Sequence, residues 1–147
     1  MNTLVKTMPS SKIFSSAHCQ PLVQHLRSHF PGLLAVYAFG SRIQGLATVD
    51  SDLDLAILLP GYADPLSLWT LSSELAELAG CLVDVLDLRA ASTVMQDQIL
   101  TTGIRCWAAD DNQADMFEIA MLNEKLALDE ARSELLDDIA KRGTIYD

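Results

Sequence analysis

The chain has 147 residues and half of them are apolar, which is enough for one globular domain whose core needs no metal or disulfide. Its net charge of −10 repels a phosphate backbone, and no basic stripe with aromatic residues runs through it, so a nucleic acid is disfavoured as substrate. No apolar run approaches the ~20 residues of a spanning helix and no signal-peptide stretch opens the chain, which predicts a cytoplasmic protein without a membrane segment.

The acidic residues are unevenly distributed. The first 49 residues contain none and begin rich in Ser and Thr, which faintly resembles a transit peptide and is the alternative to a cytoplasmic location. Ten of the twenty acids fall between Asp110 and Asp138. This stretch predicts either a well-solvated helix or a docking surface for a basic partner.

The cysteines and histidines form no recognisable metal or disulfide pattern. Cys19, Cys81 and Cys106 are odd in number and widely spaced, with no CxxC pair, so we expect small core residues. His25 and His29 stand four apart on a predicted helix, a spacing that two metal ligands could use. With no acid nearby and no HExxH pattern, a helix surface is the favoured interpretation.

In chain order, the first half predicts one helix and two strands. Apolar residues recur at helical spacing over residues 19–30, and a Pro-Gly pair ends that helix. Residues 33–39 are a short apolar run bounded by glycines, which predicts a buried strand. Residues 52–59 predict a second strand. The segment 42–51 between them is too long for a tight hairpin but could hold one helical turn.

The second half alternates helices with strands. Asp64 and Pro65 start a helix that Gly80 ends. Four apolar residues are expected to form its buried face: Leu66, Trp69, Leu75 and Leu78. A third strand is predicted over 81–88. Three elements follow it: a helix over 92–100 capped by Ser92, an edge strand over 104–108 and a long helix over 111–141.

This order of elements predicts one domain over residues 1–147. The fold class is α+β, close to α/β, with a small mixed sheet of about four strands, helices packed on the sheet and a long C-terminal helix. The last helix carries an apolar stripe made of Phe117, Met121, Leu128, Leu135 and Ile139. Ile119, Leu122 and Leu126 lie off this stripe, so the apolar surface is wider than a small domain needs, which predicts either core packing or a docking surface.

Two carboxylates stand at the start of the second predicted strand. Residues two apart on a strand point the same way, so Asp52 and Asp54 lie on one face. Carboxylates held this close repel, and a divalent cation with hard oxygen ligands, most often Mg²⁺, relieves the repulsion. Taken alone, an Asp-x-Asp pair at a strand edge is more often structural.

A Gly-Ser pair changes that interpretation. Gly40 and Ser41 leave the first apolar strand, where a glycine lets the backbone approach a phosphate, and the N–H groups with the Ser hydroxyl can bind oxygens of a triphosphate. The informative feature is the combination: Gly40-Ser41, ten residues, then Asp52-x-Asp54, followed by a third strand that carries a further acid.

That third strand offers two candidate acids. An Asp within an apolar strand needs a partner or a metal. Asp84 alternates with Leu86 and lies at the beginning of the strand, whereas Asp87 is on the opposite face near the end, where Arg89 could neutralise it. We therefore predict Asp84, and not Asp87, as the third acid of the site.

Residues 40–54 resemble the GSx10DxD signature of the nucleotidyltransferase superfamily that includes DNA polymerase beta and the kanamycin-type enzymes, with every defining position matched. The length resembles that of the minimal nucleotidyltransferases (MNT), the antitoxins of HEPN/MNT toxin–antitoxin pairs. The resemblance is strong over about residues 33–88 and implies a nucleotidyltransferase fold. It also implies ATP as substrate with Mg²⁺, in two ions.

The resemblance assigns a role to each site residue. Asp52 and Asp54 would hold both metal ions, and Asp84 would complete the ion that lowers the pKa of the acceptor hydroxyl. The nucleotide would lie on Gly40 and Ser41, with Ser41 at the β- and γ-phosphates. Arg42 would add a positive charge there, or else form a surface salt bridge.

The implied function is transfer of AMP from ATP to a tyrosine of a HEPN toxin, a small helical ribonuclease that the chain binds as a hetero-oligomer and neutralises. Two alternatives stay open at this point. The first is a small-molecule nucleotidyltransferase of the aminoglycoside type, in which the acidic surface attracts a cationic substrate. The second is an antitoxin that acts by occlusion, without catalysis.

Overall fold

The computed structural model describes residues 16–43 and 52–146. Most of the segment 42–51, in which a helical turn is expected, therefore lies outside the described residues. The elements, in chain order, are α2 (Ser16–His29), β1 (Ala35–Phe39), β2 (Leu53–Leu58), α3 (Pro65–Ala79), β3 (Val83–Asp87), the 3-10 turn η2 (Leu88–Ala90), α4 (Thr93–Thr102), β4 (Ile104–Ala108) and α5 (Asp111–Tyr146).

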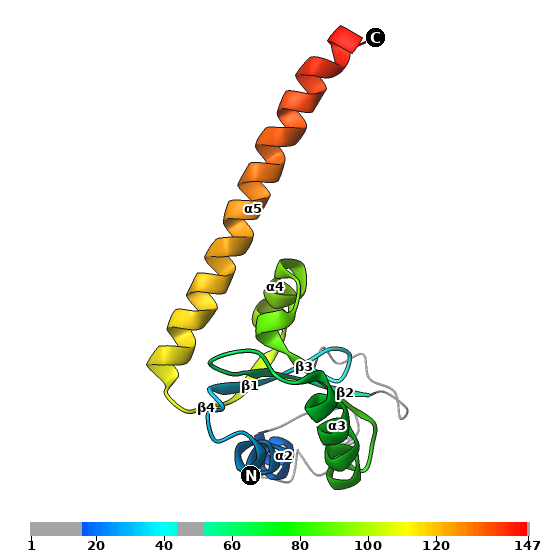
Figure 1. Ribbon diagram of the computed structural model, residues 1–147, viewed down its shortest axis with the longest axis vertical. Coiled ribbons are helices and arrows are strands. Elements are labelled where there is room, and N and C mark those ends of the chain that lie inside the picture. Colours follow the sequence, from blue (N-terminus) through cyan, green and yellow to red (C-terminus); the bar gives the residue numbers. More distant parts are fainter. Residues whose placement is uncertain (1–15, 44–51, 147) are drawn as a thin grey trace, which may run out of the picture.

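Within these residues, four strands form one mixed sheet in the order β3-β2-β1-β4. β1 pairs antiparallel with both β2 and β4, whereas β2 and β3 run parallel and are connected through α3. Helices α2 and α3 lie below the sheet in Figure 1, and α4 with the start of α5 lies above it. The predicted α+β fold and its mixed sheet are confirmed, and β4 is an edge strand as expected.

The strands are apolar on both faces because each face has its own core. On β2, Leu53, Leu55 and Ile57 pack in the cluster that α2 and α3 cover. Ala56 and Leu58 alternate with them and pack in the cluster that includes residues of α4 and α5. A polar side chain on either face of β2 is therefore exceptional, which makes the position of Asp54 informative.

Helix α3 is rotated from the predicted orientation. Of the four residues expected on its buried face only Leu75 is buried, while Leu66, Trp69 and Leu78 are 75%, 78% and 52% exposed. The buried stripe instead runs through Leu71 and Leu75. Trp69 stands two residues before Leu71 and Leu66 stands five before it, which places them about 200° and 140° around the helix from the buried stripe. The prediction was wrong because it followed side-chain size and not the 3.6-residue period.

Two polar contacts connect α2 to its neighbours. His25 Nε2 lies 2.6 Å from Oε1 of Glu74 on α3, so His25 is on the helix surface as predicted but has a partner. The Sγ of buried Cys19 lies 2.8 Å from the Sγ of Cys106 on β4. Cys81 and Cys106 are only partly buried against the core, so the prediction of core cysteines holds fully for Cys19 alone.

The beginning of α5 is attached to the sheet through ion pairs. Arg105 Nη1 on β4 donates to Asp115 Oδ1 and to Glu118 Oε2, each at 2.8 Å. The Tyr37 hydroxyl on β1 donates to the same Glu118 oxygen at 2.7 Å. Ala114 and Met121 are buried beside these contacts, so this first part of α5 belongs to the domain.

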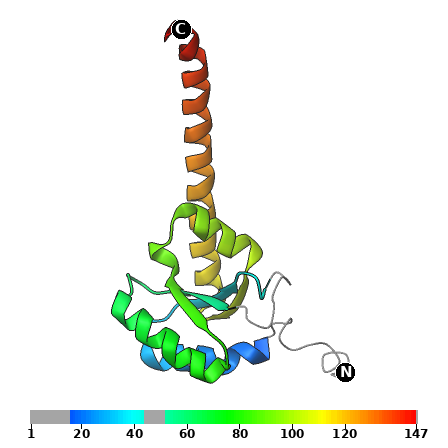
Figure 2. The same cartoon turned by 90° about the vertical axis from the view of Figure 1, so that its right-hand side faces the viewer.

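The rest of α5 leaves the domain. The helix has 36 residues and ends five residues after the predicted end at residue 141. Figures 1 and 2 show it running away from the sheet and the other helices. Between positions 126 and 142, its large apolar side chains are all at least half exposed: Leu126, Leu128, Leu135, Leu136 and Ile139. Despite its length, neither α5 nor any other helix in the described part of the chain is apolar enough to cross a bilayer.

The observed orientation of α3 gives a stability test. Leu71 is fully buried, so Leu71→Ala should lower the free energy of unfolding by about 2–5 kcal/mol through lost contacts and the cavity left behind. Leu66→Ala, on the exposed side of the same helix, should change it by less than about 0.5 kcal/mol. Urea denaturation followed by circular dichroism measures both values. Equal losses in the two variants would contradict the observed orientation.

Candidate functional site

The Gly40-Ser41 turn ends β1 beside Asp54. Gly40 has a φ of +90°, a conformation that side chains disfavour, and a Cβ placed on it would collide with the Asp54 carboxylate. The N–H of Ile43 donates to the Gly40 carbonyl at 3.1 Å and closes the turn. Ser41 and Arg42 lie in this turn, half-buried. Gly40 is thus required both by its backbone conformation and by the close approach of an acidic side chain.

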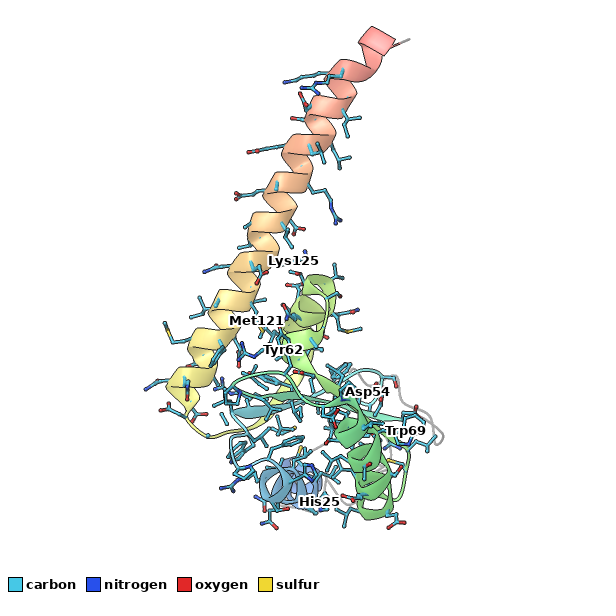
Figure 3. All side chains as sticks on the ribbon, viewed as in Figure 1. His25, Asp54, Tyr62, Trp69, Met121 and Lys125 are labelled. Carbon is cyan, nitrogen blue, oxygen red and sulfur yellow. The ribbon has the colours of Figure 1, made fainter. Side chains whose placement is uncertain are left out.

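Asp54 lies between the other predicted site residues. On β2, its Cα pairs with Phe39 of β1 on one side and with Asp84 of β3 on the other. Residues paired in register point to the same face of a sheet, so Asp54 and Asp84 are lateral neighbours on the face toward α4. Asp52 precedes β2 by one residue and is exposed. Figure 3 labels Asp54 on the sheet.

The electrostatics of Asp54 reflect this crowding. Burial, followed by the negative charges of Asp84 and Asp52, raises the pKa of Asp54 to about 6. The three carboxylates are therefore close enough to repel one another, as predicted from the strand pattern. In residues 16–43 and 52–146, no three His, Cys, Asp or Glu side chains are already arranged as a complete set of metal ligands.

Asp87 has a structural role on the opposite face of β3. It is 6% exposed, and its carboxylate accepts the N–H of Ala63 at 2.8 Å and the N–H of Arg89 at 3.1 Å. The structure thus brings Asp84, and not Asp87, next to Asp54. The expected neutralisation by the Arg89 side chain was wrong, because the Arg89 Nε and Nη2 atoms donate to the Leu59 carbonyl at 3.0 and 2.8 Å.

A cleft next to Asp84 was missed by the sequence analysis. It has a volume of about 600 Å³ and follows the free edge of β3 between α3 and the start of α4. Asp84 forms part of its wall, together with Tyr62, Leu68, Trp69 and Met95. The cleft was missed because the sequence analysis placed Trp69 on the buried face of α3, whereas its side chain forms part of the cleft wall. Trp69 stands two residues before Leu71 and so lies off the 3.6-residue period of the buried stripe, and this was the available signal.

Comparisons with known proteins identify relatives across most of the chain. The family described as polymerase beta, nucleotidyltransferase matches residues 21–112. The protein adenylyltransferase MntA of Shewanella oneidensis is 32% identical over 118 residues, which are 80% of this chain and 84% of that protein.

Solved structures agree with this assignment. A chain of a toxin–antitoxin complex with AMP-PNP is 31% identical, with a TM-score of 0.71 over 86% of this chain and 99% of that one. A chain from the tri-AMPylated Shewanella oneidensis HEPN toxin in complex with its MNT antitoxin is 28% identical, with a TM-score of 0.69 over 84% of this chain and 97% of that one.

The raised pKa of Asp54 predicts how stability depends on pH in the metal-free protein. Because the folded chain holds a proton on Asp54 up to about pH 6 and the unfolded chain releases it near pH 4, the free energy of unfolding falls as pH rises through this window. Asp54→Asn removes this titration. The variant should therefore gain stability relative to wild type between about pH 4 and 6, and keep a constant advantage above that range.

Urea denaturation in EDTA across this pH range measures the difference between the two proteins. Asp137→Asn, which removes one negative charge from an exposed position of α5, is the matched control and should show no such window. If wild type instead gained stability over Asp54→Asn as pH rose, the carboxylate of Asp54 would be stabilised by its surroundings, and the crowding described above would be wrong.

Proposed function

The chain belongs to the polymerase beta nucleotidyltransferase family, and on that basis we propose that it transfers AMP from ATP to a tyrosine of a HEPN toxin and so acts as the antitoxin of that toxin. The observation that carries this proposal is the position of Asp54, between the Gly40 turn and Asp84 on three neighbouring strands. The acceptor protein would be a HEPN toxin, as in the solved complex of a tri-AMPylated HEPN toxin with its MNT antitoxin. The location would be cytoplasmic, where reducing conditions suit three free cysteines.

The three carboxylates fit divalent cations. Asp52, Asp54 and Asp84 supply hard oxygen ligands, and the raised pKa of Asp54 reflects negative charge that a cation would relieve. We propose that they hold two Mg²⁺ ions together with oxygens of the triphosphate, since Mg²⁺ sites commonly combine one or two carboxylates with substrate phosphates. When bound, Mg²⁺ supplies positive charge that neutralises the triphosphate and lowers the pKa of the attacking hydroxyl.

The residues of the chain then position the reactants. Gly40 and Ser41 bind the β- and γ-phosphates through backbone N–H groups and the Ser41 hydroxyl, and Arg42 adds a positive charge nearby. The tyrosine oxygen attacks the α-phosphorus, and the bond from that phosphorus to the pyrophosphate oxygen breaks. The proton of the tyrosine passes to Asp84, and pyrophosphate leaves from the Gly40 side. One phosphodiester bond forms and one phosphoanhydride bond is lost.

The distal part of α5 is the proposed docking surface for the toxin. Past the end of α4, no other element of the described chain lies beside α5. The apolar side chains there are at least half exposed: Leu126, Leu128, Leu135, Leu136 and Ile139. Acidic side chains surround them, including Asp129, Glu130 and Glu134. An apolar surface bordered by acids favours a partner with a basic, partly apolar face.

The assignment of three catalytic acids predicts the effects of single amide substitutions. Asp52→Asn, Asp54→Asn and Asp84→Asn should each lower the rate of AMP transfer by more than about tenfold, because losing a metal ligand removes several kcal/mol of transition-state stabilisation. Asp87→Asn is the control on the opposite face of β3 and should stay active once its folded fraction is taken into account. Intact-mass spectrometry of the toxin after incubation with ATP and Mg²⁺ measures transfer. An inactive Asp87→Asn beside an active Asp84→Asn would reverse the assignment.

Catalysis and docking should separate. The Asp52→Asn/Asp54→Asn double variant should still co-elute with the toxin in size-exclusion chromatography but add no mass to it. Leu128→Gln/Leu135→Gln, which replaces two exposed leucines with helix-favouring polar residues, should weaken the complex, whereas Met116→Gln on the proximal part of α5 should not. If wild type adds no AMP and the double variant neutralises the toxin equally well, occlusion is the mechanism and the proposed transfer is wrong.

A further inference from the structure

The cleft beside Asp84 presents large aromatic side chains to solvent. Trp69 on α3 is 78% exposed, Tyr62 in the loop before α3 is 73% exposed, and Met95 at the start of α4 is 36% exposed. Figure 3 shows Trp69 on α3, on the side of the molecule that carries Asp54. Exposed tryptophan and tyrosine around a depression are enriched at protein-binding surfaces, where they bury much area at little entropic cost.

Sheet order determines which reactant lies over which strand. Under the proposed function, the pyrophosphate group binds at the Gly40-Ser41 turn after β1, and the α-phosphate lies near Asp54 on β2. In phosphoryl and nucleotidyl transfer the attacking and leaving oxygens stand on opposite sides of the phosphorus. The attacking hydroxyl must then enter from the side opposite β1, which is the side of β3 and Asp84. The cleft opens along that same strand.

The chemistry of the cleft wall excludes a second phosphate site. Its charged side chains are Asp84 and Asp87, and Asp87 is already bonded to two backbone N–H groups. Among the residues that the structure describes, no Lys or Arg belongs to the wall. An apolar, aromatic surface with one exposed carboxylate fits a neutral or basic peptide segment and disfavours an anionic one.

We infer that this cleft holds the acceptor segment of the partner protein, with Trp69, Tyr62 and Met95 binding the residues around the modified tyrosine and Asp84 facing its hydroxyl. The inference rests on the proposed function and adds to it the surface that selects the acceptor. Trp69 lies on α3, outside the turn after β1 at which the phosphates are proposed to bind. The inference therefore assigns Trp69 to acceptor recognition and not to ATP binding.

The test compares Trp69→Ala with Leu66→Ala. Both residues are three-quarters exposed on α3, so neither substitution should unfold the chain. They differ in that Trp69 lines the cleft and Leu66 does not. Initial rates of AMP transfer are measured with a purified HEPN toxin that wild type modifies as acceptor, varying acceptor and ATP in turn. Trp69→Ala should lower kcat/KM for the acceptor by about tenfold or more while KM for ATP changes by less than about twofold. Leu66→Ala should match wild type in both, and Met95→Ala should follow Trp69→Ala with a smaller loss.

Each alternative outcome has one meaning. If Trp69→Ala raises KM for ATP and leaves the acceptor parameters unchanged, the cleft holds the nucleotide base and the inference is wrong. If Trp69→Ala behaves like Leu66→Ala, the cleft has no part in the reaction and the inference fails, although AMP transfer by wild type still supports the proposed function. If wild type modifies no HEPN toxin, the proposed function fails and the inference falls with it.

Discussion

A half-buried carboxylate among like charges is the constraint around which this domain is arranged. Asp54 lies on a central strand that is otherwise apolar, beside Asp84 on the neighbouring strand and close to Asp52. Its pKa is raised because the site is partly buried and holds other negative charges. Such an arrangement lowers the stability of the folded chain, and selection for stability alone would replace it with an apolar residue. Gly40 then follows from Asp54, because only a residue without a side chain leaves room for that carboxylate.

The two hydrophobic cores stabilise the sheet and offset the stability lost through the repulsion among these carboxylates. The lower face of β2 and β3 is filled by apolar side chains packed against α2 and α3. The upper face is buried near α4 and α5 but opens toward the strand ends where the carboxylates stand. The edge β3 is held partly through α3, since the N–H of Val85 donates to the Ser72 hydroxyl at 3.2 Å. Rigid packing on one face therefore positions the reactive groups on the other.

Much of the fold could be predicted from the sequence because its signals are local. Gly and Pro residues mark the ends of the strands, and the order of the eight α-helices and strands in the described residues was predicted correctly, with bounds that differ by a few residues and without the 3-10 turn η2. The proximity of Asp54 to Asp84 also followed, because both were placed near the beginning of their predicted strands, and in the structure each is the second residue of its strand. Their roles in catalysis remain predictions. The orientation of α3, the carbonyl partner of Arg89 and the cleft were missed, because each depends on contacts between segments distant in the sequence.

The exposed end of α5 has a consequence for the lifetime of the chain. Helices gain most of their stability from packing, and the distal part of α5 packs against nothing in the described chain, so its hydrogen bonds open at little free-energy cost. Proteases cleave segments that open in this way. A bound partner would cover the same helix and slow that cleavage. Degradation and assembly would then compete for one surface, and the fraction of chains that survive would follow the amount of partner present.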